Sequence, residues 1–179
     1  RYKSLFYCHK SRMEFVDKGV AQDTTWVANN TVEINNRVES YKYDKDIILS
    51  SGTLNKRKKN ESLIRAFGEI LPHIDEKIKL IFIGDGVDMP NLKKLVQELE
   101  IDTRVVFLGK ILDEKVLISY FKRSYISVSF GQAGLSILHS FGYGVPYITS
   151  KDAISGGETS NIKNNFNVIL TENSEKSLQ

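Results

Sequence analysis

Four consecutive basic residues occupy positions 56–59 of the sequence, between Gly52 and Asn60. A helix is predicted to begin at Asn60, which would act as its cap, so the backbone amides and the positive end of the helix dipole would add to the charge of these side chains. The loop could therefore bind a phosphate or a similar anion. The alternative is a solvated basic loop, because most short charge runs are simply exposed.

Three glycine-rich turns follow predicted strands. Gly84-Asp85-Gly86 would let the backbone approach a ligand closely, and residues 131–134, Gly-Gln-Ala-Gly, precede a predicted helix in a second arrangement suited to phosphate. The third turn, Gly156-Gly157, leads to Glu158. Neither the Gly-x-Gly-x-x-Gly fingerprint nor the Walker lysine-serine pair occurs in the sequence, which disfavours NAD and ATP as ligands.

Two titratable side chains stand beside these turns. His139 lies one turn into the helix predicted after Gly134, and a lone histidine near apolar positions is more often structural than catalytic. Glu158 stands at a predicted helix start, where its charge would either favour the helix dipole or serve as a buried acid in a cleft.

Composition and charge exclude several classes of function. The 25 basic and 22 acidic residues leave a net charge of +3, which is too small to argue for a nucleic acid partner. The single cysteine, Cys8, excludes an internal disulfide and a cysteine metal cluster. The triplet Asp44-Lys45-Asp46 resembles a metal-binding Asp-x-Asp signature, but it precedes a predicted strand and has no further acids beside it, so we expect no metal there.

Short apolar runs alternate with amphipathic stretches from Asp46 onward, as in β-α units around a parallel sheet. Strands are predicted at 47–51, 79–83, 104–108, 125–129, 146–149 and 167–170. Helices are predicted at 60–71, 91–99, 113–121 and 135–141. The predicted fold is therefore α/β, with a doubly wound, Rossmann-like parallel sheet whose ligands bind beyond the carboxyl ends of the strands.

Residues 1–45 do not follow this alternation. A helix is predicted over 4–20, a strand over 24–28 and an irregular linker over 29–44. We expect residues 1–45 to contain the end of a preceding domain and a linker, and residues 46–179 to form one domain. Because the chain begins at Arg1 instead of Met, we also expect it to be a fragment of a longer protein.

Taken in order, these segments resemble the C-terminal, donor-binding domain of the retaining group 1 (family 4) glycosyltransferases, which have two facing Rossmann-like domains, the GT-B architecture. The resemblance covers residues 28–170. Each matching segment is common by itself, but their order and spacing are specific. The segments that carry it are 51–58, 63–67, 80–86, 105–109, 134–138, 143–146 and 156–158.

The resemblance implies a site for the donor of the sugar. Lys58 would hold the donor diphosphate, assisted by the backbone amides of 134–136. The family's usual arginine falls on Thr53, and we infer that Arg57 or Lys56 supplies the missing cation. The turn at 109–111 would lie beside the nucleobase. The predicted donor-binding residues are Gly52, Arg57, Lys58, Gly84, Gly109, Lys110, Gly131, Gly134, Leu135, Ser136 and His139.

The chain departs from the family at its two glutamates, which fall on Gly131 and His139. An imidazole can replace the carboxylate that binds ribose hydroxyls, because one ring nitrogen can make the same hydrogen bond, whereas glycine cannot replace the carboxylate near the sugar. A branch of capsule and exopolysaccharide glycosyltransferases has a similar Gly-x-x-Gly-Leu-x-x-x-His-Ser pattern. Glu158 is then the predicted catalytic acid.

The function that the resemblance implies is transfer of a sugar, with retention of configuration, from a nucleotide sugar to a glycan or a lipid-linked acceptor in surface polysaccharide synthesis. UDP is the expected nucleotide, and no metal cofactor is expected because cations and amides would stabilise the departing diphosphate. We expect a cytoplasmic protein with peripheral contact at the inner face of the membrane. Without its acceptor domain, the chain is expected to transfer nothing.

Two alternatives remain at this stage. A non-catalytic, degenerate subunit would keep the fold for binding or assembly, and loss of both glutamates favours it. The retained basic loop, Gly134 and Glu158 argue against it. A nucleotide-binding module of another doubly wound family is the other alternative.

Overall fold

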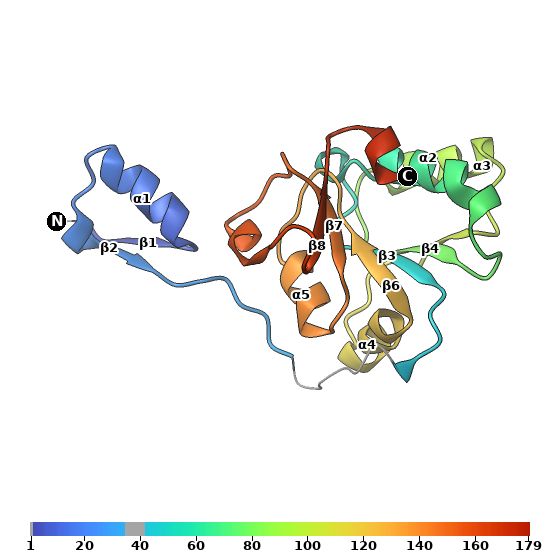
Figure 1. Ribbon diagram of the computed structural model, residues 1–179, viewed down its shortest axis with the longest axis horizontal. Helices are drawn as coiled ribbons and strands as arrows, with labels where there is room; N and C mark the ends of the chain where they lie inside the picture. Colours follow the sequence, from blue (N-terminus) through green and yellow to red (C-terminus); the bar gives the residue numbers. More distant parts are fainter. Residues whose placement is uncertain (1, 35–41) are drawn as a thin grey trace.

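The computed structural model describes residues 2–34 and 42–179. Its main feature is a six-stranded parallel sheet in the order β5-β4-β3-β6-β7-β8. The order proceeds outward in both directions from β3 and β6, which is the doubly wound topology. The predicted fold class is therefore confirmed (Figure 1). The strands are β3 (Ile47–Ser51), β4 (Lys79–Ile83), β5 (Val105–Phe107), β6 (Ser124–Val128), β7 (Tyr147–Ser150) and β8 (Val168–Thr171).

Helices cover both faces of this sheet (Figure 1). On one face lie α2 (Asn60–Ile70) and α3 (Met89–Glu98), and on the other lie α4 (Glu114–Lys122) and α5 (Ser136–Gly142). Short 3-10 turns are η3 (Lys56–Lys58), η4 (Leu71–His73), η5 (Glu158–Asn161) and η6 (Glu175–Leu178).

Strand β4 shows why these apolar runs become central strands. Leu80 and Phe82 pack into the core under α2 and α3, while Ile81 and Ile83 pack into the core under α4. Both faces of the strand are buried, so its sequence is continuously apolar instead of alternating. The ring of Phe82 stacks on Phe107 of β5, with centroids 4.9 Å apart.

One predicted cap is wrong. Asn60 is the first residue of α2 instead of its cap, and its side chain is buried. The residue before it, Lys59, takes the cap position with a left-handed backbone, φ 53°. The turn that places Lys59 there is built by η3, which ends directly before it.

The first part of the chain forms a separate small βαβ unit (Figure 1). Its elements are β1 (Ser4–Phe6), α1 (His9–Asp17), η1 (Gln22–Thr24) and β2 (Thr25–Val27), and the two strands pair in parallel. The predicted strand at 24–28 is confirmed as β2, but the predicted helix over 4–20 is wrong at both ends. Part of the predicted linker, 35–41, lies outside the described residues.

The paired acids of the Asp-x-Asp triplet lie at the amino end of β3, away from the edge where ligands bind. Asp44 pairs with Lys77 at 3.1 Å, and Asp46 pairs with Arg123. In the described ranges, no helix is long and apolar enough to cross a membrane.

Candidate donor-binding site

A cavity of about 680 Å³ opens at the carboxyl ends of the central strands. Its walls come from the segments after β3, β4, β5 and β6, from the first turn of α5, and from α4. This is the position at which a doubly wound sheet binds its ligands. The lining residues are Ser51, Gly52, Thr53, Asn55, Lys58, Ile83, Gly84, Asp85, Lys110, Ile111, Leu117, Phe121, Gln132, Gly134, Leu135, Ser136 and His139.

Most of the predicted donor-binding residues meet in this cavity, although they come from segments up to 87 positions apart in sequence. Those that line it are Gly52, Lys58, Gly84, Lys110, Gly134, Leu135, Ser136 and His139. Four predicted site residues do not line it: Arg57, Gly109, Gly131 and Glu158. Sequence reasoning missed Asn55 and Gln132, whose polar side chains carry no distinguishing pattern.

Lys58 is a half-buried cation of the cavity lining. Its Nζ atom donates a hydrogen bond to Ser129 Oγ at 3.0 Å. Burial lowers the pKa of the Lys58 ammonium from 10.5 to about 8, because a charged group loses hydration there. A neutral hydroxyl compensates this loss only in part, so the position favours an arriving anion.

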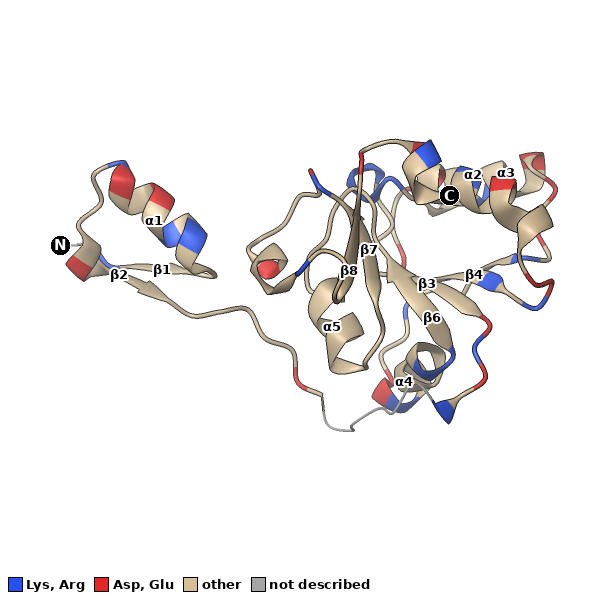
Figure 2. Cartoon of the chain, in the orientation of Figure 1, with Lys and Arg blue, Asp and Glu red and all other residues tan. Residues whose placement is uncertain are grey.

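The local turn explains why Lys58, of four adjacent cations, points inward. Asn55 Oδ1 accepts a hydrogen bond from the backbone amide of Arg57 at 3.0 Å and starts η3. The left-handed Lys59 then ends that turn. Lys56 and Arg57 remain exposed outside the cavity, while Lys110 supplies its second lysine. Figure 2 shows the basic segment as blue ribbon leading into α2.

Part of the cavity floor, at Gly52 and Gly84, is made of main chain. A Cβ atom on Gly84 would lie 2.0 Å from the carbonyl oxygen of Gly52, and one on Gly86 would lie 2.1 Å from that of Leu54. Backbone hydrogen bonds from Gly52 and Leu54 continue the pairing of β3 and β4 into these loops. The carbonyl of Gly109 accepts from the Gly84 amide in turn. Gly84 and Gly86 are therefore required, because any side chain there would overlap the neighbouring backbone.

Gly131 packs against the basic loop. Its amide donates to the carbonyl of Lys58 at 3.1 Å, and a Cβ atom on it would lie 2.2 Å from the carbonyl oxygen of Arg57. Such a distance is a steric overlap with backbone, so this loop arrangement admits only glycine. The contact gives a structural reason why this chain has no glutamate at position 131.

His139 lies on α5 and faces the cavity, half-buried. Its ring is nearly parallel to that of Tyr143, with centroids 6.5 Å apart. Burial lowers the pKa of the imidazole below 6.5, which favours the neutral ring at pH 7. A neutral imidazole offers one hydrogen-bond donor and one acceptor.

Glu158 lies outside this cavity, at the start of η5, and is 4% exposed. Its Oε1 atom accepts from Asn30 Nδ2 at 2.7 Å, and its Oε2 atom accepts from Ser155 Oγ at 3.0 Å and from the Gly156 amide at 2.8 Å. Burial alone would raise the pKa of this carboxyl, but these hydrogen bonds and its own backbone amide lower it below 4.5. The catalytic role of Glu158 stays a prediction.

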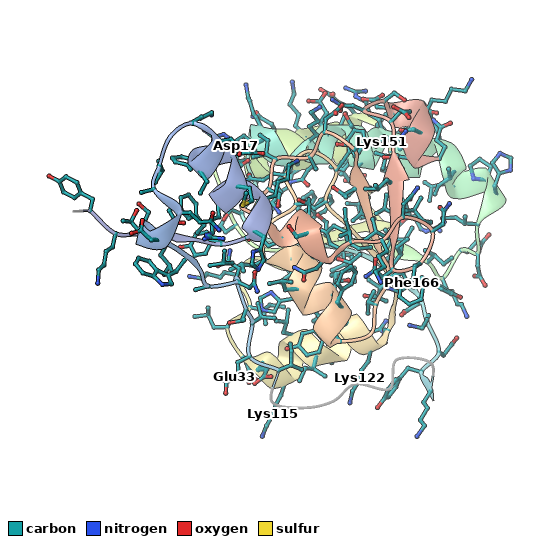
Figure 3. The ribbon with its side chains drawn as sticks, turned by 60° about the vertical axis from the view of Figure 1, so that its left-hand side comes forward. Asp17, Glu33, Lys115, Lys122, Lys151 and Phe166 are labelled. Atoms are coloured by element: carbon teal, nitrogen blue, oxygen red, sulfur yellow. The ribbon has the colours of Figure 1, made fainter. Side chains whose placement is uncertain are left out.

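The same segment also meets the N-terminal unit. A Cβ atom on Gly157 would lie 3.1 Å from Cys8 Cβ, and Gly157 has a φ of 121°, which favours glycine. Figure 3, where Asp17 marks the end of α1, shows this unit beside the larger sheet. Residues 155–158 therefore contact both the N-terminal unit and the linker that follows it.

The geometry defines a Rossmann-like domain with an anion-compatible cavity, and comparison with known proteins gives its family. Residues 32–179 match the family described as glycosyl transferases group 1. The chain belongs to this family.

Three similar proteins place the chain among its relatives. It is 33% identical over 104 residues to the alpha-monoglucosyldiacylglycerol synthase of Streptococcus pneumoniae, and the match covers 56% of the chain and 23% of that protein. It is 28% identical over 118 residues to the N-acetyl-alpha-D-glucosaminyl L-malate synthase of Bacillus anthracis, and this match covers 63% of the chain and 30% of that protein. The crystal structure of HepE of Anabaena in complex with UDP is also similar, with a TM-score of 0.75 and 19% sequence identity. The superposition covers 97% of this chain and 51% of HepE. The chain thus spans less than a third of both synthases.

Proposed function

We propose that this chain is the donor-binding part of a glycosyltransferase that takes its sugar from a nucleotide sugar, with UDP as the nucleotide. One observation carries the proposal: the half-buried Lys58 ammonium faces the cavity with a neutral hydroxyl as its partner. A diphosphate would provide the missing counter-charge. The UDP bound to the structurally similar HepE supports the choice of nucleotide.

The proposed chemistry depends on charge that develops on the departing diphosphate. Lys58 and Lys110 would stabilise that charge in a site from which bound substrate excludes water. In this proposal, these groups do the work for which other enzymes use a metal ion. Retention of the sugar's configuration is part of the proposal and rests on the family resemblance.

The acceptor is proposed to be a glycan or a lipid-linked glycan in surface polysaccharide synthesis, bound by the domain that precedes residue 46. The name of the pneumococcal relative contains a lipid, which supports a membrane-associated acceptor. We accordingly propose a cytoplasmic protein that contacts the inner membrane surface.

A calorimetric screen of UDP, GDP and ADP and of their sugar conjugates tests the proposal. We expect saturable binding of UDP and UDP-sugars, stronger than that of UMP or uridine. Binding of GDP or ADP in preference to UDP would correct the nucleotide. Binding of none of them would refute the donor site.

A second candidate function is a degenerate subunit that binds nucleotide without transferring sugar. The observation that favours it is Gly131, because the loop geometry excludes a carboxylate there. Transfer assays with the full-length protein over a broad donor panel separate the candidates. UDP binding without transfer by the intact protein would favour the degenerate subunit.

A further inference from the structure

The face of the sheet beneath α5 contains a cluster of hydroxyl groups. Its members come from β6 and the residue that follows it, from β7 and from α5, and each is at most 9% exposed. They share this face because residues two apart on a strand point the same way, and because Ser127 pairs in register with Tyr147. The members are Ser127, Ser129, Ser136, Ser140, Tyr147 and Thr149.

Most hydroxyls of this cluster have a hydrogen-bond partner. Ser140 Oγ donates to the carbonyl of Val145 at 2.8 Å, and Thr149 Oγ1 donates to that of Ser129 at 2.9 Å. Ser127 is the exception, since its hydroxyl has no partner among the described residues. Buried polar groups that satisfy one another hold a single geometry, because breaking any of their bonds leaves an unpaired group.

Tyr147 lies in this cluster beside Ser136, which lines the cavity. Its Oη atom is 2.7 Å from Ser136 Oγ. Ser129, which accepts from Lys58 Nζ, lies nearby and donates its own hydroxyl proton to the carbonyl of Gln132 at 2.6 Å. The Tyr147 hydroxyl therefore supports Ser136, a residue of the cavity lining, from within the core.

The phenol of Tyr147 can act as donor or acceptor in its bond with Ser136. Burial raises the pKa of Tyr147 to about 12, so the hydroxyl keeps its proton. In the Ser136–Tyr147 bond either oxygen can be the donor. When Ser136 turns its proton toward an anion in the cavity, Tyr147 can donate to the Ser136 oxygen, so neither hydroxyl loses its partner.

We propose that Tyr147 is a positioning residue of the donor site, whose hydroxyl orients Ser136 toward the diphosphate of the nucleotide. This inference rests on the proposed function. It predicts that the hydroxyl of Tyr147 contributes to binding of phosphate groups and contributes nothing to binding of the nucleoside.

The Tyr147→Phe substitution removes one oxygen atom and keeps the ring that fills the core. We would titrate the parent and this variant with UDP, with inorganic pyrophosphate and with uridine. We expect UDP and pyrophosphate to bind about three- to tenfold more weakly, as for loss of one hydrogen bond, and uridine to bind unchanged. Equal weakening of all three ligands, or no weakening, would overturn the inference.

Tyr143→Phe is the matched control. Tyr143 is also a buried tyrosine next to α5, but its hydroxyl interacts with Glu114. The substitution keeps the ring beside His139, so the ratio of UDP affinity to uridine affinity should equal that of the parent. A change in that ratio similar to the change in Tyr147→Phe would attribute the effect to general loosening of the core and overturn the inference.

A double-mutant cycle tests the route through Ser136. Ser136→Ala should weaken UDP, and adding Tyr147→Phe should weaken it further by less than twofold, because the two hydroxyls act together. If the double variant loses UDP affinity by the product of the two single losses, the two hydroxyls act independently and this route is overturned. A parent that binds neither UDP nor pyrophosphate would refute the proposed function as well, whereas Tyr147→Phe binding like a competent parent would refute the inference alone.

Discussion

Asn30 and Glu158 are joined by a hydrogen bond of 2.7 Å, from Asn30 Nδ2 to Glu158 Oε1, across 128 positions of sequence. The bond connects the segment after β2 to η5. From η5 the contacts continue into the cavity wall, because Ile154 exchanges backbone hydrogen bonds with Gly131 and Ala133. Residues 154–158 therefore connect the linker, through Glu158, to the turn before α5, through Ile154.

Glu158→Gln is expected to destabilise the protein. The amide group of glutamine must turn its NH₂ toward one of the donors that now face the carboxylate, namely Asn30 Nδ2 or the Ser155 and Gly156 pair. The expected loss is about 1–3 kcal/mol of unfolding free energy, measured by chemical denaturation. Glu172→Gln is the control: its ion pair with Lys151 is exposed, so its effect should stay within about 0.5 kcal/mol.

The loss of stability in Glu158→Gln should depend on pH and be largest where the carboxylate is charged. Because the folded-state pKa of Glu158 is lowered below 4.5, its carboxylate stabilises the fold above that pH, and this contribution is lost as pH falls through the folded-state pKa. The stability difference between the parent and Glu158→Gln should therefore shrink below pH 4.5. A difference that is constant from pH 7 to pH 3 would contradict the role of the charge.

Catalysis by Glu158 is a separate prediction for the full-length enzyme. If the carboxylate acts in the transition state, Glu158→Gln lowers kcat by tenfold or more, on the order of 1.4 kcal/mol, and leaves donor affinity unchanged. If Glu158 only holds the loop, stability falls and kcat at low temperature stays near that of the parent. Steady-state kinetics on both proteins distinguish these outcomes.

UDP affinity is expected to fall above pH 8. The free protein loses the Lys58 proton around its pKa of about 8, and a bound diphosphate needs the charged form, so binding at pH 9 requires uptake of a proton. We expect roughly tenfold weaker UDP binding at pH 9 than at pH 7, by calorimetry. Lys58→Met should bind weakly at both pH values. Lys59→Met, one residue along and outside the cavity lining, should keep the dependence of the parent.

Lys58 should also make unfolding depend on pH. Its folded-state pKa lies below the ordinary 10.5, so the cost of burying the charge is fully present below pH 8 and is relieved as pH rises toward 10.5. The stability of the parent relative to Lys58→Met should increase over that interval. Parallel pH profiles would show that Lys58 is not buried as described.

Gly131→Ala is expected to destabilise the domain by about 1–3 kcal/mol, because the added methyl group overlaps the backbone of the basic loop. Gly68→Ala provides the contrast within the same protein. Gly68 lies inside α2 with ordinary contacts around an added Cβ, so alanine there should stabilise by up to about 1 kcal/mol. Thermal denaturation measures both, and a tolerated Gly131→Ala would remove the steric reason for the missing glutamate.

His139→Ala is expected to weaken uridine and UDP alike, by about 0.5–1.5 kcal/mol, the usual net value of one neutral hydrogen bond. Pyrophosphate, which has no ribose, serves as the internal control and should bind unchanged. A large fall in melting temperature with unchanged uridine affinity would assign His139 a structural role instead.

The central sheet is predictable from sequence because its signal is local. A run such as Leu80 to Ile83 is apolar at every position, and helices with spaced apolar residues separate it from the next run. All ten predicted strands and helices after residue 46 agree with the structure within two residues at each end. The β1 strand gives no such signal, since its three residues become a strand only by pairing with Thr25–Val27.

The candidate site is predictable in its chemistry but only partly in its geometry. The basic loop marks an anion site, yet which cation points inward depends on the Asn55 cap and the left-handed Lys59. The location of Glu158 depends on Asn30, more than a hundred residues away, and no local pattern carries that information. Tyr147 is equally inconspicuous, because a tyrosine in a strand is ordinary until its partner Ser136 is known.

The main-chain floor of the cavity has a consequence for how such a protein can change. Gly84 meets the backbone of Gly52 and Gly86 meets that of Leu54, so neither glycine can gain a side chain without displacing the loops that follow two central strands. The rest of the lining includes side chains that have no such constraint, among them Lys110, Gln132 and His139. New ligand preferences can therefore arise by substitution at those positions, while the contacts of the two glycines remain an inherited constant.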